Sequence, residues 1–301
     1  MWGYLRKVAN ALVRRTIGNL IVLQMMNRFS GKDMWVNFDE LEVHAPKEKI
    51  FAKTLYKLKK RQFEPLTIKI FQQVLSPGMT VLDIGANLGV YTLLAASRVG
   101  PTGKVFAFEP DPYVYPWLVR NIQINNLEDR VNAIQKAVAS REGKAILFST
   151  HGSGRSSLFR NRNYERERGE KLEIETIALD IFCDKDLIPD IIKIDVEGAE
   201  IEVLKGAKEV IARTSNIYLF IECAPRALRE AGYSPNDLID ILRDMGFVLF
   251  FIDDIRFGLT QIKSARESKR IVQEIDRTVG HANLLCIKGK HNSSILSQYR
   301  W

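Results

Sequence analysis

A chain of 301 residues with 46% apolar side chains can bury one sizeable α/β core, so we expect one main domain with an appendage. Its 44 Lys and Arg residues outnumber its 36 Asp and Glu residues, but the first 62 residues hold 13 basic against 5 acidic side chains, and the other 239 carry 31 of each. A neutral main domain argues against a nucleic-acid partner, because phosphate neutralisation dominates that binding.

Residues 1–30 place apolar and basic side chains at near-helical spacing and contain no acid, which predicts a basic amphipathic helix. The longest uncharged stretch, residues 16–27, is 12 residues long, shorter than the roughly 20 residues that span a bilayer. No small-residue cleavage site follows it, as a signal peptide would require. Two interpretations stay open: peripheral attachment to a membrane, or packing on the protein's own core or across a dimer.

The three cysteines are far apart in the sequence and odd in number, which is typical of reduced thiols. We therefore expect a cytoplasmic protein, with contact at the membrane surface as the alternative. The four histidines show no metal-binding spacing, so we predict no histidine-based zinc site.

Before the core, residues 33–44 alternate apolar and polar side chains and predict a hairpin or strand, and residues 53–61 predict a lysine-rich helix face. Residues 65–75 predict a helix, with Pro65 at an early position and Ser-Pro-Gly after its end.

Residues 79–84 form an apolar run that ends in Asp83 and Ile84, and the segment Gly85-Ala86-Asn87-Leu88-Gly89 follows it. This pattern predicts a buried strand, a ligand-binding turn and the start of a helix. The glycines are four residues apart and do not form G-x-G-x-x-G, so the dinucleotide fingerprint is only half met. Such a turn suits a ligand without a diphosphate and points towards S-adenosylmethionine (SAM).

A second apolar run, residues 104–108, ends at Glu109 and Pro110. An acidic residue at the end of the second strand of such a fold accepts hydrogen bonds from ribose hydroxyls. The two motifs together predict a nucleoside site, although Glu109 could instead serve only to cap the proline turn.

Further along, residues 113–124 predict a helix, residues 131–135 a strand, residues 136–139 a loop, and residues 173–179 another strand. Residues 145–149 begin a less regular section. Loops at the position of residues 136–139 commonly frame an adenine, which brings Val138 to the expected site.

A third buried strand, residues 191–196, ends in Asp195 and is followed by Glu197 and by a predicted helix over residues 201–212. Open α/β sheets bind their ligands at the carboxyl ends of their strands, and a cluster of carboxylates there suits a sulfonium better than a phosphate. The strand over residues 217–221 ends at Glu222.

The last part of the chain predicts a helix that begins near Ser234 and two strands, residues 248–252 and 283–287. Between these strands, residues 256–281 read as a polar insertion. Strands that alternate with helices imply a largely parallel sheet with right-handed crossovers.

The segments VLDIGANLGVYT, VFAFEPDP, GRSSL, TIALD, IIKIDVEGAEIEVLKGA and IYLFIE resemble the FkbM-type SAM-dependent methyltransferases over about residues 63–288. The resemblance implies a Rossmann-like class I methyltransferase fold. Its mostly parallel seven-stranded sheet would have the order 3-2-1-4-5-7-6, an antiparallel last strand, and helices on both faces. The domain would occupy residues 63–290, after an extension over residues 1–62 and before a tail over residues 291–301.

The resemblance also implies SAM-dependent methylation, most often of a hydroxyl on a sugar, glycolipid or secondary metabolite. We expect the following residues to bind SAM: Asp83, Gly85, Ala86, Asn87, Gly89, Thr92, Glu109, Pro110, Val138 and Asp195.

An alcohol acceptor needs a base to take its proton. The candidates are Glu197 and Asp195, followed by Glu222 and by Glu64, which directly precedes the helix over residues 65–75. Two neighbouring carboxylates could instead hold a divalent cation on the acceptor oxygen, an alternative that we do not favour. The competing functions are an NAD-dependent oxidoreductase and a SAM-fold protein that binds a partner without catalysis.

Overall fold

The computed structural model describes residues 24, 26, 33–150, 156–161, 164–165, 168–278, 280–290 and 298–299. The predicted helix over residues 1–30 and the predicted tail over residues 291–301 lie almost wholly outside the described residues. The chain divides into two compact units, Met1–Phe63 and Glu64–Trp301.

The first unit contains the hairpin that the alternating pattern predicts. Strands β1 (Asp33–Phe38) and β2 (Leu41–Pro46) pair antiparallel. Asp39 and Glu40 make the two-residue turn with positive φ values of 49° and 68°, the backbone shape that matches the twist of a tight hairpin. Helix α2 (Lys49–Lys59) follows and contains most of the lysine-rich segment.

The second unit alternates strands and helices. Its strands are β3 (Thr80–Ile84), β4 (Lys104–Phe108), β5 (Val131–Ile134), β6 (Ala137–Val138), β7 (Gly143–Ser149), β8 (Glu170–Ile177), β9 (Ile191–Ile194), β10 (Ile217–Cys223), β11 (Val248–Asp253), β12 (Gly258–Gln261) and β13 (Ala282–Lys288). Its described helices are α3 (Pro65–Val74), α4 (Val90–Val99), α5 (Tyr115–Ile124), α7 (Leu179–Phe182), α8 (Glu200–Lys205), α9 (Lys208–Arg213), α10 (Pro225–Glu230), α11 (Pro235–Asp244) and α12 (Ala265–Arg277).

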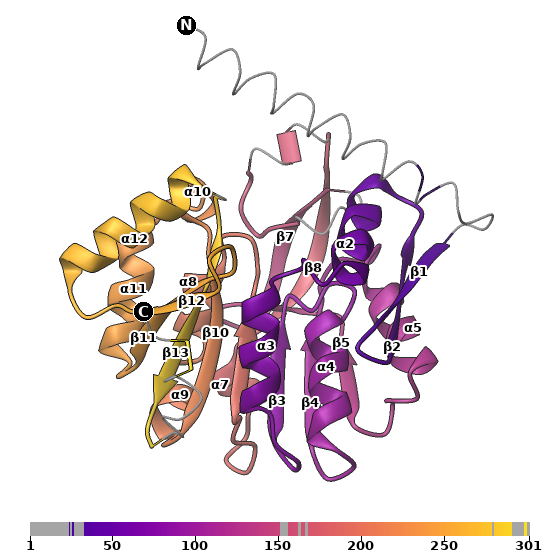
Figure 1. Cartoon of the computed structure of the whole chain (residues 1–301), viewed down its shortest axis with the longest axis horizontal. Coiled ribbons are helices and arrows are strands. Elements are labelled where there is room, and N and C mark those ends of the chain that lie inside the picture. The colour runs from indigo at the N-terminus through magenta and orange to yellow at the C-terminus, as the bar shows by residue number, and fades with distance from the viewer. Residues whose placement is uncertain are drawn as a thin grey trace, which may run out of the picture. The chain divides into compact units, whose positions relative to one another are not determined.

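The central sheet has eight strands in the order β12-β11-β13-β10-β9-β3-β4-β5. Helices α3 and α4 lie in front of this sheet in Figure 1. Strands β5, β4, β3, β9 and β10 are parallel neighbours, and β13 pairs antiparallel with β10 and with β11. These seven strands follow the order 3-2-1-4-5-7-6. The predicted count of seven is wrong by one, because β12 pairs antiparallel with β11 and extends that edge.

Alternate residues of the strands point to the two faces of this sheet, and each face is covered by helices. On one face Phe71 of α3 packs edge to face against Phe220 of β10, with ring centroids 5.2 Å apart. On the other, Ile192, Ile194 and Leu219 belong to a buried cluster with residues of α8, α9, α11 and α12. Residues of both faces meet at the carboxyl ends of the strands, where the candidate site lies.

A second sheet, β6-β8-β7, corrects two predictions from the sequence. Residues 137–138, predicted as loop, pair with β8 as a two-residue parallel strand. Residues 145–149, predicted to be irregular, belong to β7, which pairs antiparallel with β8 along seven residues. Both strands are held by hydrogen bonds to β8, and the sequence pattern of one strand does not show which distant strand will pair with it.

The predicted helix over residues 201–212 is divided into α8 and α9 at Gly206. A Cβ at Gly206 would lie 2.1 Å from the carbonyl oxygen of Ala139, so the backbone passes too close to another segment for any side chain. The Asp180 carboxylate accepts the backbone N–H of Val210 at 2.8 Å and satisfies the start of the second helix.

The predicted polar insertion over residues 256–281 is instead ordered into β12 and α12. Ser264 and Glu267 form a capping box at the start of α12, and only Ser268, Ile271, Val272 and Ile275 are buried along its 13 residues. Because α12 has so few apolar positions among its charged residues, its composition resembles that of a polar loop, and the helix was not predicted. Among the described helices none is long and apolar enough to cross a membrane.

Candidate functional site

The glycine turn after β3 is held by backbone hydrogen bonds to the neighbouring strand. The N–H groups of Gly85 and Ala86 both donate to the carbonyl oxygen of Phe108, at 2.9 Å each. Gly85 has a φ of +80°, and a Cβ there would lie 1.9 Å from the carbonyl oxygen of Asp195. Only glycine therefore fits between the ends of β3 and β9.

Asp83 lies beneath this turn and is buried. Its carboxylate accepts the hydroxyl of Thr92, the third residue of α4, at 2.5 Å. Burial raises the pKa of Asp83 to about 6 although the Thr92 bond lowers it. Asp83 and Thr92 thus join the strand to the helix that follows it.

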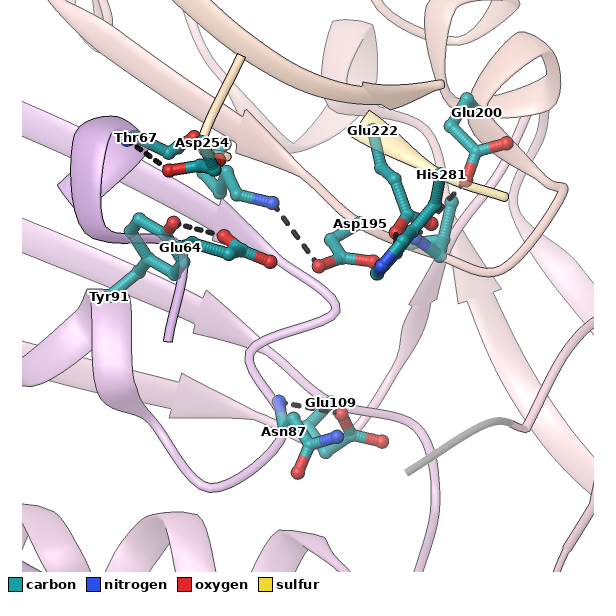
Figure 2. Close-up of polar contacts among 12 residues, drawn as sticks. Glu64, Thr67, Asn87, Tyr91, Glu109, Asp195, Glu200, Glu222, Asp254 and His281 are labelled. Carbon is teal, nitrogen blue, oxygen red and sulfur yellow. Dashed lines mark hydrogen bonds and ion pairs between the residues drawn. The ribbon is translucent and has the colours of Figure 1, made fainter. Parts of the chain in front are cut away.

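Glu109 holds the turn from the next strand and is also buried. Its two carboxylate oxygens accept the backbone N–H groups of Asn87 and of Asp111, at 2.9 Å each, and Figure 2 shows the bond to Asn87. Burial raises the pKa of Glu109 to about 7. Each oxygen keeps a second lone pair, so the carboxylate can still accept hydroxyl donors from a ligand.

A pocket opens at the carboxyl ends of β3, β4, β5 and β9 and contains about 590 Å³ of space, its open mouth included. It is lined by Ile84, Gly85, Asn87, Phe108, Glu109, Pro110, Asp111, Val114, Lys136, Ala137, Val138, Leu147, Ser156, Ser157, Leu158, Asp195, Val196, Glu197 and Ala199. A few convergent polar groups on apolar walls are typical of a small-molecule site.

Six of the ten residues expected to bind SAM line this pocket: Gly85, Asn87, Glu109, Pro110, Val138 and Asp195. The other four support the turn from behind: Asp83 and Thr92 through their hydrogen bond, Ala86 through its bond to Phe108, and Gly89 as the residue before α4. A Cβ at Gly89 would lie 2.7 Å from the Leu118 side chain.

Asp111 is a pocket residue that the sequence did not single out. It is buried, and one of its oxygens accepts the hydroxyls of Ser149 at 2.9 Å and Ser156 at 2.6 Å. These bonds join the end of β4 to β7 and to the segment that lines the opposite wall. The sequence signal for Asp111 was its place in the segment Glu109-Pro110-Asp111-Pro112, directly after a strand.

Glu64, Asp195 and Lys193 form a charged cluster that we call the acid–lysine cluster, and its Asp195 also lines the pocket. Figure 2 shows Glu64 and Asp195 near one another. Lys193 is buried at the centre of β9, with its Nζ atom 3.3 Å from the Asp195 carboxylate and 5.0 Å from the ring centroid of Tyr91. Burial alone would lower the pKa of Lys193, but the charges of Asp195 and Glu64 outweigh it and raise this pKa.

Glu64 accepts the hydroxyl hydrogen bond of Tyr91, whose ring packs against Phe71. Burial raises the pKa of Glu64 to about 7, while the charge of Lys193 lowers it. The sequence singled out Glu64 and Asp195, but it missed Lys193 and Tyr91. A lysine inside the otherwise apolar run IIKI was the available signal.

Glu222, near the end of β10, forms a second group with His281 and Glu200. It is buried and accepts a hydrogen bond from Nδ1 of His281 at 2.8 Å. Glu200 is fully buried at the start of α8, and burial, followed by the charge of Glu222, raises its pKa to about 8. The second oxygens of Glu200 and Glu222 have no hydrogen-bond partner within the described part of the chain.

Glu197, expected as a base, lines the pocket in a left-handed conformation with a φ of 52°. Its carbonyl oxygen accepts the hydroxyl of Ser157 at 2.8 Å. The next residue, Gly198, has a φ of +105°, and a Cβ there would lie 2.8 Å from the carbonyl oxygen of Ala227. The segment after β9 is therefore tightly turned, and its shape aims Asp195 and Glu197 at the same end of the sheet.

No group of three or more His, Cys, Asp or Glu side chains among the described residues is arranged to hold a metal ion. The carboxylates of this edge instead pair with Lys193, Tyr91 and His281.

Comparison with known proteins agrees with this arrangement. Residues 83–249, more than half of the chain, match the model of the methyltransferase FkbM domain. Methyltransferase sdnD of Sordaria araneosa is 33% identical over 157 residues, which cover 43% of this chain and 60% of that protein. The chain thus spans three fifths of the length of that relative.

Two further relatives match over a longer part of their sequences. The 2-O-methyltransferase NoeI of Sinorhizobium fredii is 27% identical over 203 residues, which cover 62% of this chain and 81% of that protein. The 31-O-demethyl-FK506 methyltransferase FkbM of Streptomyces tacrolimicus is 27% identical over 217 residues, with 62% and 80% covered. The matched region begins at the Asp83 turn and includes the ends of β4, β9 and β10, and on this evidence the chain belongs to the FkbM methyltransferase family.

Proposed function

We propose that this protein is a SAM-dependent O-methyltransferase whose acceptor is a hydroxyl group on a sugar, a glycolipid or a secondary metabolite. The observation that carries the proposal is the pocket at the carboxyl ends of the parallel strands, with Glu109 and Asp195 on its wall. Relatives named as 2-O- and 31-O-demethyl methyltransferases support transfer to oxygen.

The pocket residues fit the chemistry of SAM. The Glu109 carboxylate can accept ribose hydroxyls, and Val138 and Leu147 offer an apolar wall to the adenine ring. Asp195 supplies negative charge for a cationic ligand, and the missing side chain at Gly85 lets the ligand approach the backbone. None of these features requires a diphosphate, which NAD would bring.

When bound, SAM supplies a methyl group on a positively charged sulfur that is already a good leaving group. The protein must hold the acceptor oxygen close to that methyl group, and such positioning can contribute about 7 to 11 kcal/mol. We assign the positioning of the acceptor to the acid–lysine cluster, whose Asp195 lines the pocket, and to the group around Glu222. Lys193 balances the negative charge of the carboxylates there.

Transfer of labelled methyl from SAM tests this proposal. The purified chain would be incubated with labelled SAM and with separate glycolipid, polysaccharide, small-metabolite and RNA fractions of the host. We expect label in one of the first three fractions, in a base-stable ether linkage, and loss of the label with excess unlabelled SAM. Label in the RNA fraction alone, or on nitrogen, would contradict the proposed acceptor class.

A further inference from the structure

The pair formed by His281 and Glu222 lies at the same end of the sheet as the acid–lysine cluster. Glu222 is the penultimate residue of β10, and Asn283 of β13 lies opposite it in the antiparallel pair. His281 directly precedes β13, and the Glu222 carboxylate accepts from its Nδ1 at 2.8 Å. A buried carboxylate on Nδ1 fixes the ring orientation and leaves Nε2 as the free nitrogen of the neutral ring.

The two side chains differ in their exposure. The Glu222 side chain is 7% exposed, whereas the His281 side chain is 53% exposed. Within the described residues Glu222 is the only hydrogen-bond partner of the His281 ring. The imidazole is therefore anchored on its buried side and open on its other side, where an acceptor could reach it.

Titratable groups from several elements surround this ring. Glu222 comes from β10, Asp195 from the end of β9, and Glu64 from the start of α3, and the charges of all three act on His281. Figure 2 shows His281 beside Asp195 and Glu222, with Glu64 on the other side of Asp195. Lys193, the nearest cation of β9, is paired with Asp195.

The carboxylates named from the sequence are less suited to take a proton from an alcohol. Asp195 is paired with Lys193, and Glu64 holds the Tyr91 hydroxyl. Glu222 is buried behind the imidazole, and Glu197 lines the SAM pocket. Among the titratable groups that the structure describes at this end of the sheet, His281 combines an exposed side chain with a fixed ring orientation.

We propose that His281 is the general base that takes the proton of the acceptor hydroxyl and that Glu222 positions it, an assignment that rests on the proposed O-methyltransferase function. The hydroxyl proton moves to Nε2 of His281, and a lone pair of the acceptor oxygen forms the new O–C bond. The electron pair of the breaking C–S bond stays on the sulfur atom, and the imidazolium later releases its proton to solvent.

This assignment predicts a characteristic dependence on pH. The hydrogen bond and charge of Glu222 raise the pKa of His281 to about 9, and burial lowers it. Because only the neutral imidazole can accept a proton, the rate should rise with pH until about 9. Replacing Glu222 by glutamine removes that charge. The pH at which the rate stops rising should therefore move towards the ordinary histidine pKa of 6.5.

The test compares four forms of the full chain: wild type, His281→Gln, Glu222→Gln and, as a matched control, Glu142→Gln, which changes an exposed glutamate outside the site. Labelled methyl transfer from SAM into one fixed host fraction is followed from pH 6 to pH 10. We expect a 10²- to 10⁴-fold loss for His281→Gln, the size typical of general-base catalysis, without the rise with pH. Glu222→Gln should shift this rise to lower pH, and Glu142→Gln should follow the wild type.

A second readout needs no ligand. The imidazole Cε1–H resonance of His281, assigned by its absence in His281→Gln, should titrate near 9 in the wild type and near 6.5 in Glu222→Gln. A mere packing role for His281 would not change the pH profile of the reaction in this way.

The outcomes separate the two claims. Wild-type transfer that His281→Gln matches within threefold, with the same pH profile, overturns the base assignment alone. Failure of the wild type to bind SAM by calorimetry overturns the proposed function and the assignment with it. If Glu222→Gln does not fold, the half-exposed His281→Gln variant still decides.

Discussion

Two glutamates of helix α8 show how different environments shift the pKa of the same side chain in opposite directions. Glu200 is fully buried, and one of its oxygens accepts the backbone N–H of Gly198 at 3.1 Å. Burial raises its pKa to about 8, so it is neutral at pH 7 and can donate a hydrogen bond. Burial would also raise the pKa of Glu202, but hydrogen bonds from Lys205, Tyr233 and Ser140 outweigh it and lower this pKa to about 2.

The change Glu200→Gln should stabilise the protein at pH 8 and much less at pH 5. Between pH 4.5 and about 8 the unfolded chain has lost the Glu200 proton while the folded chain keeps it, so wild-type stability falls as pH rises through this window. Glutamine resembles the neutral acid and removes that loss. Thermal unfolding measured at both pH values checks this. Each kcal/mol of added stability should raise the melting temperature by roughly 2–4 °C.

Glu202→Gln is the matched control, because its sign is reversed. The lowered pKa of Glu202 stabilises the fold above about pH 4.5, and this contribution is lost as pH falls towards 2. The variant should therefore have a lower melting temperature than wild type at pH 7. A Glu200→Gln effect that is equal at pH 5 and pH 8 would mean that Glu200 is ionised in the folded protein.

The positions of individual residues also explain which members of the site could be predicted from the sequence. Asp83, Glu109 and Asp195 each lie at or just after the carboxyl end of a strand, and a glycine or proline follows within three residues. The local sequence therefore places them at the ligand-binding edge of the sheet. Lys193 lies within a strand and His281 directly before one, so neither is marked by a position at the carboxyl end of a strand. Their roles depend on partners that are close in space and distant in sequence, such as Tyr91 and Glu222.

At the scale of elements, helix α3 is capped from a distant part of the chain. Its own N-cap residue, Glu64, has a left-handed conformation and makes no side-chain cap. Asp254, after β11, instead accepts the N–H groups of Leu66 at 2.7 Å and Thr67 at 2.9 Å and the Thr67 hydroxyl at 2.6 Å. Figure 2 shows Asp254 beside Thr67, close to the turn where Glu64 begins the helix.

The change Asp254→Ala should therefore destabilise the protein by about 1 to 2 kcal/mol, the typical cost of a lost helix cap. The loss should appear as a lower urea midpoint and as faster hydrogen exchange at the amides of Leu66 and Thr67. Ile255→Ala, which changes a side chain 68% exposed on the same turn, is the control and should leave both values unchanged. Unchanged exchange at Leu66 in Asp254→Ala would show that the cap does not hold α3.

Elements with strong local signals were predicted well, and those made by partners were not. The Ser234 capping box and the early proline of α11 are visible in the sequence, and the helix begins there. Strands β6 and β12 are two and four residues long and depend on pairing with β8 and β11. Such short segments have no periodicity of their own.

For the whole molecule, alternating strands and helices together with the family resemblance predicted the seven-strand order, with β13 antiparallel at the expected place. The sequence missed β12, because nothing in residues 256–281 marks an additional edge strand. This topology matters for function because it brings the ends of β3, β4 and β9 together around one pocket.

Isothermal titration calorimetry of the full chain with SAM and, separately, with NAD tests the central claim most directly. We predict one SAM site per chain, no saturable binding of NAD, and at least tenfold weaker SAM binding by Glu109→Ala. In the proposed site the Glu109 carboxylate would accept ribose hydroxyls, and hydrogen bonds to a charged group are worth about 1.5–3 kcal/mol each. Glu142→Ala should bind SAM like the wild type. Binding of NAD without binding of SAM would contradict the assignment of this pocket to a methyl donor.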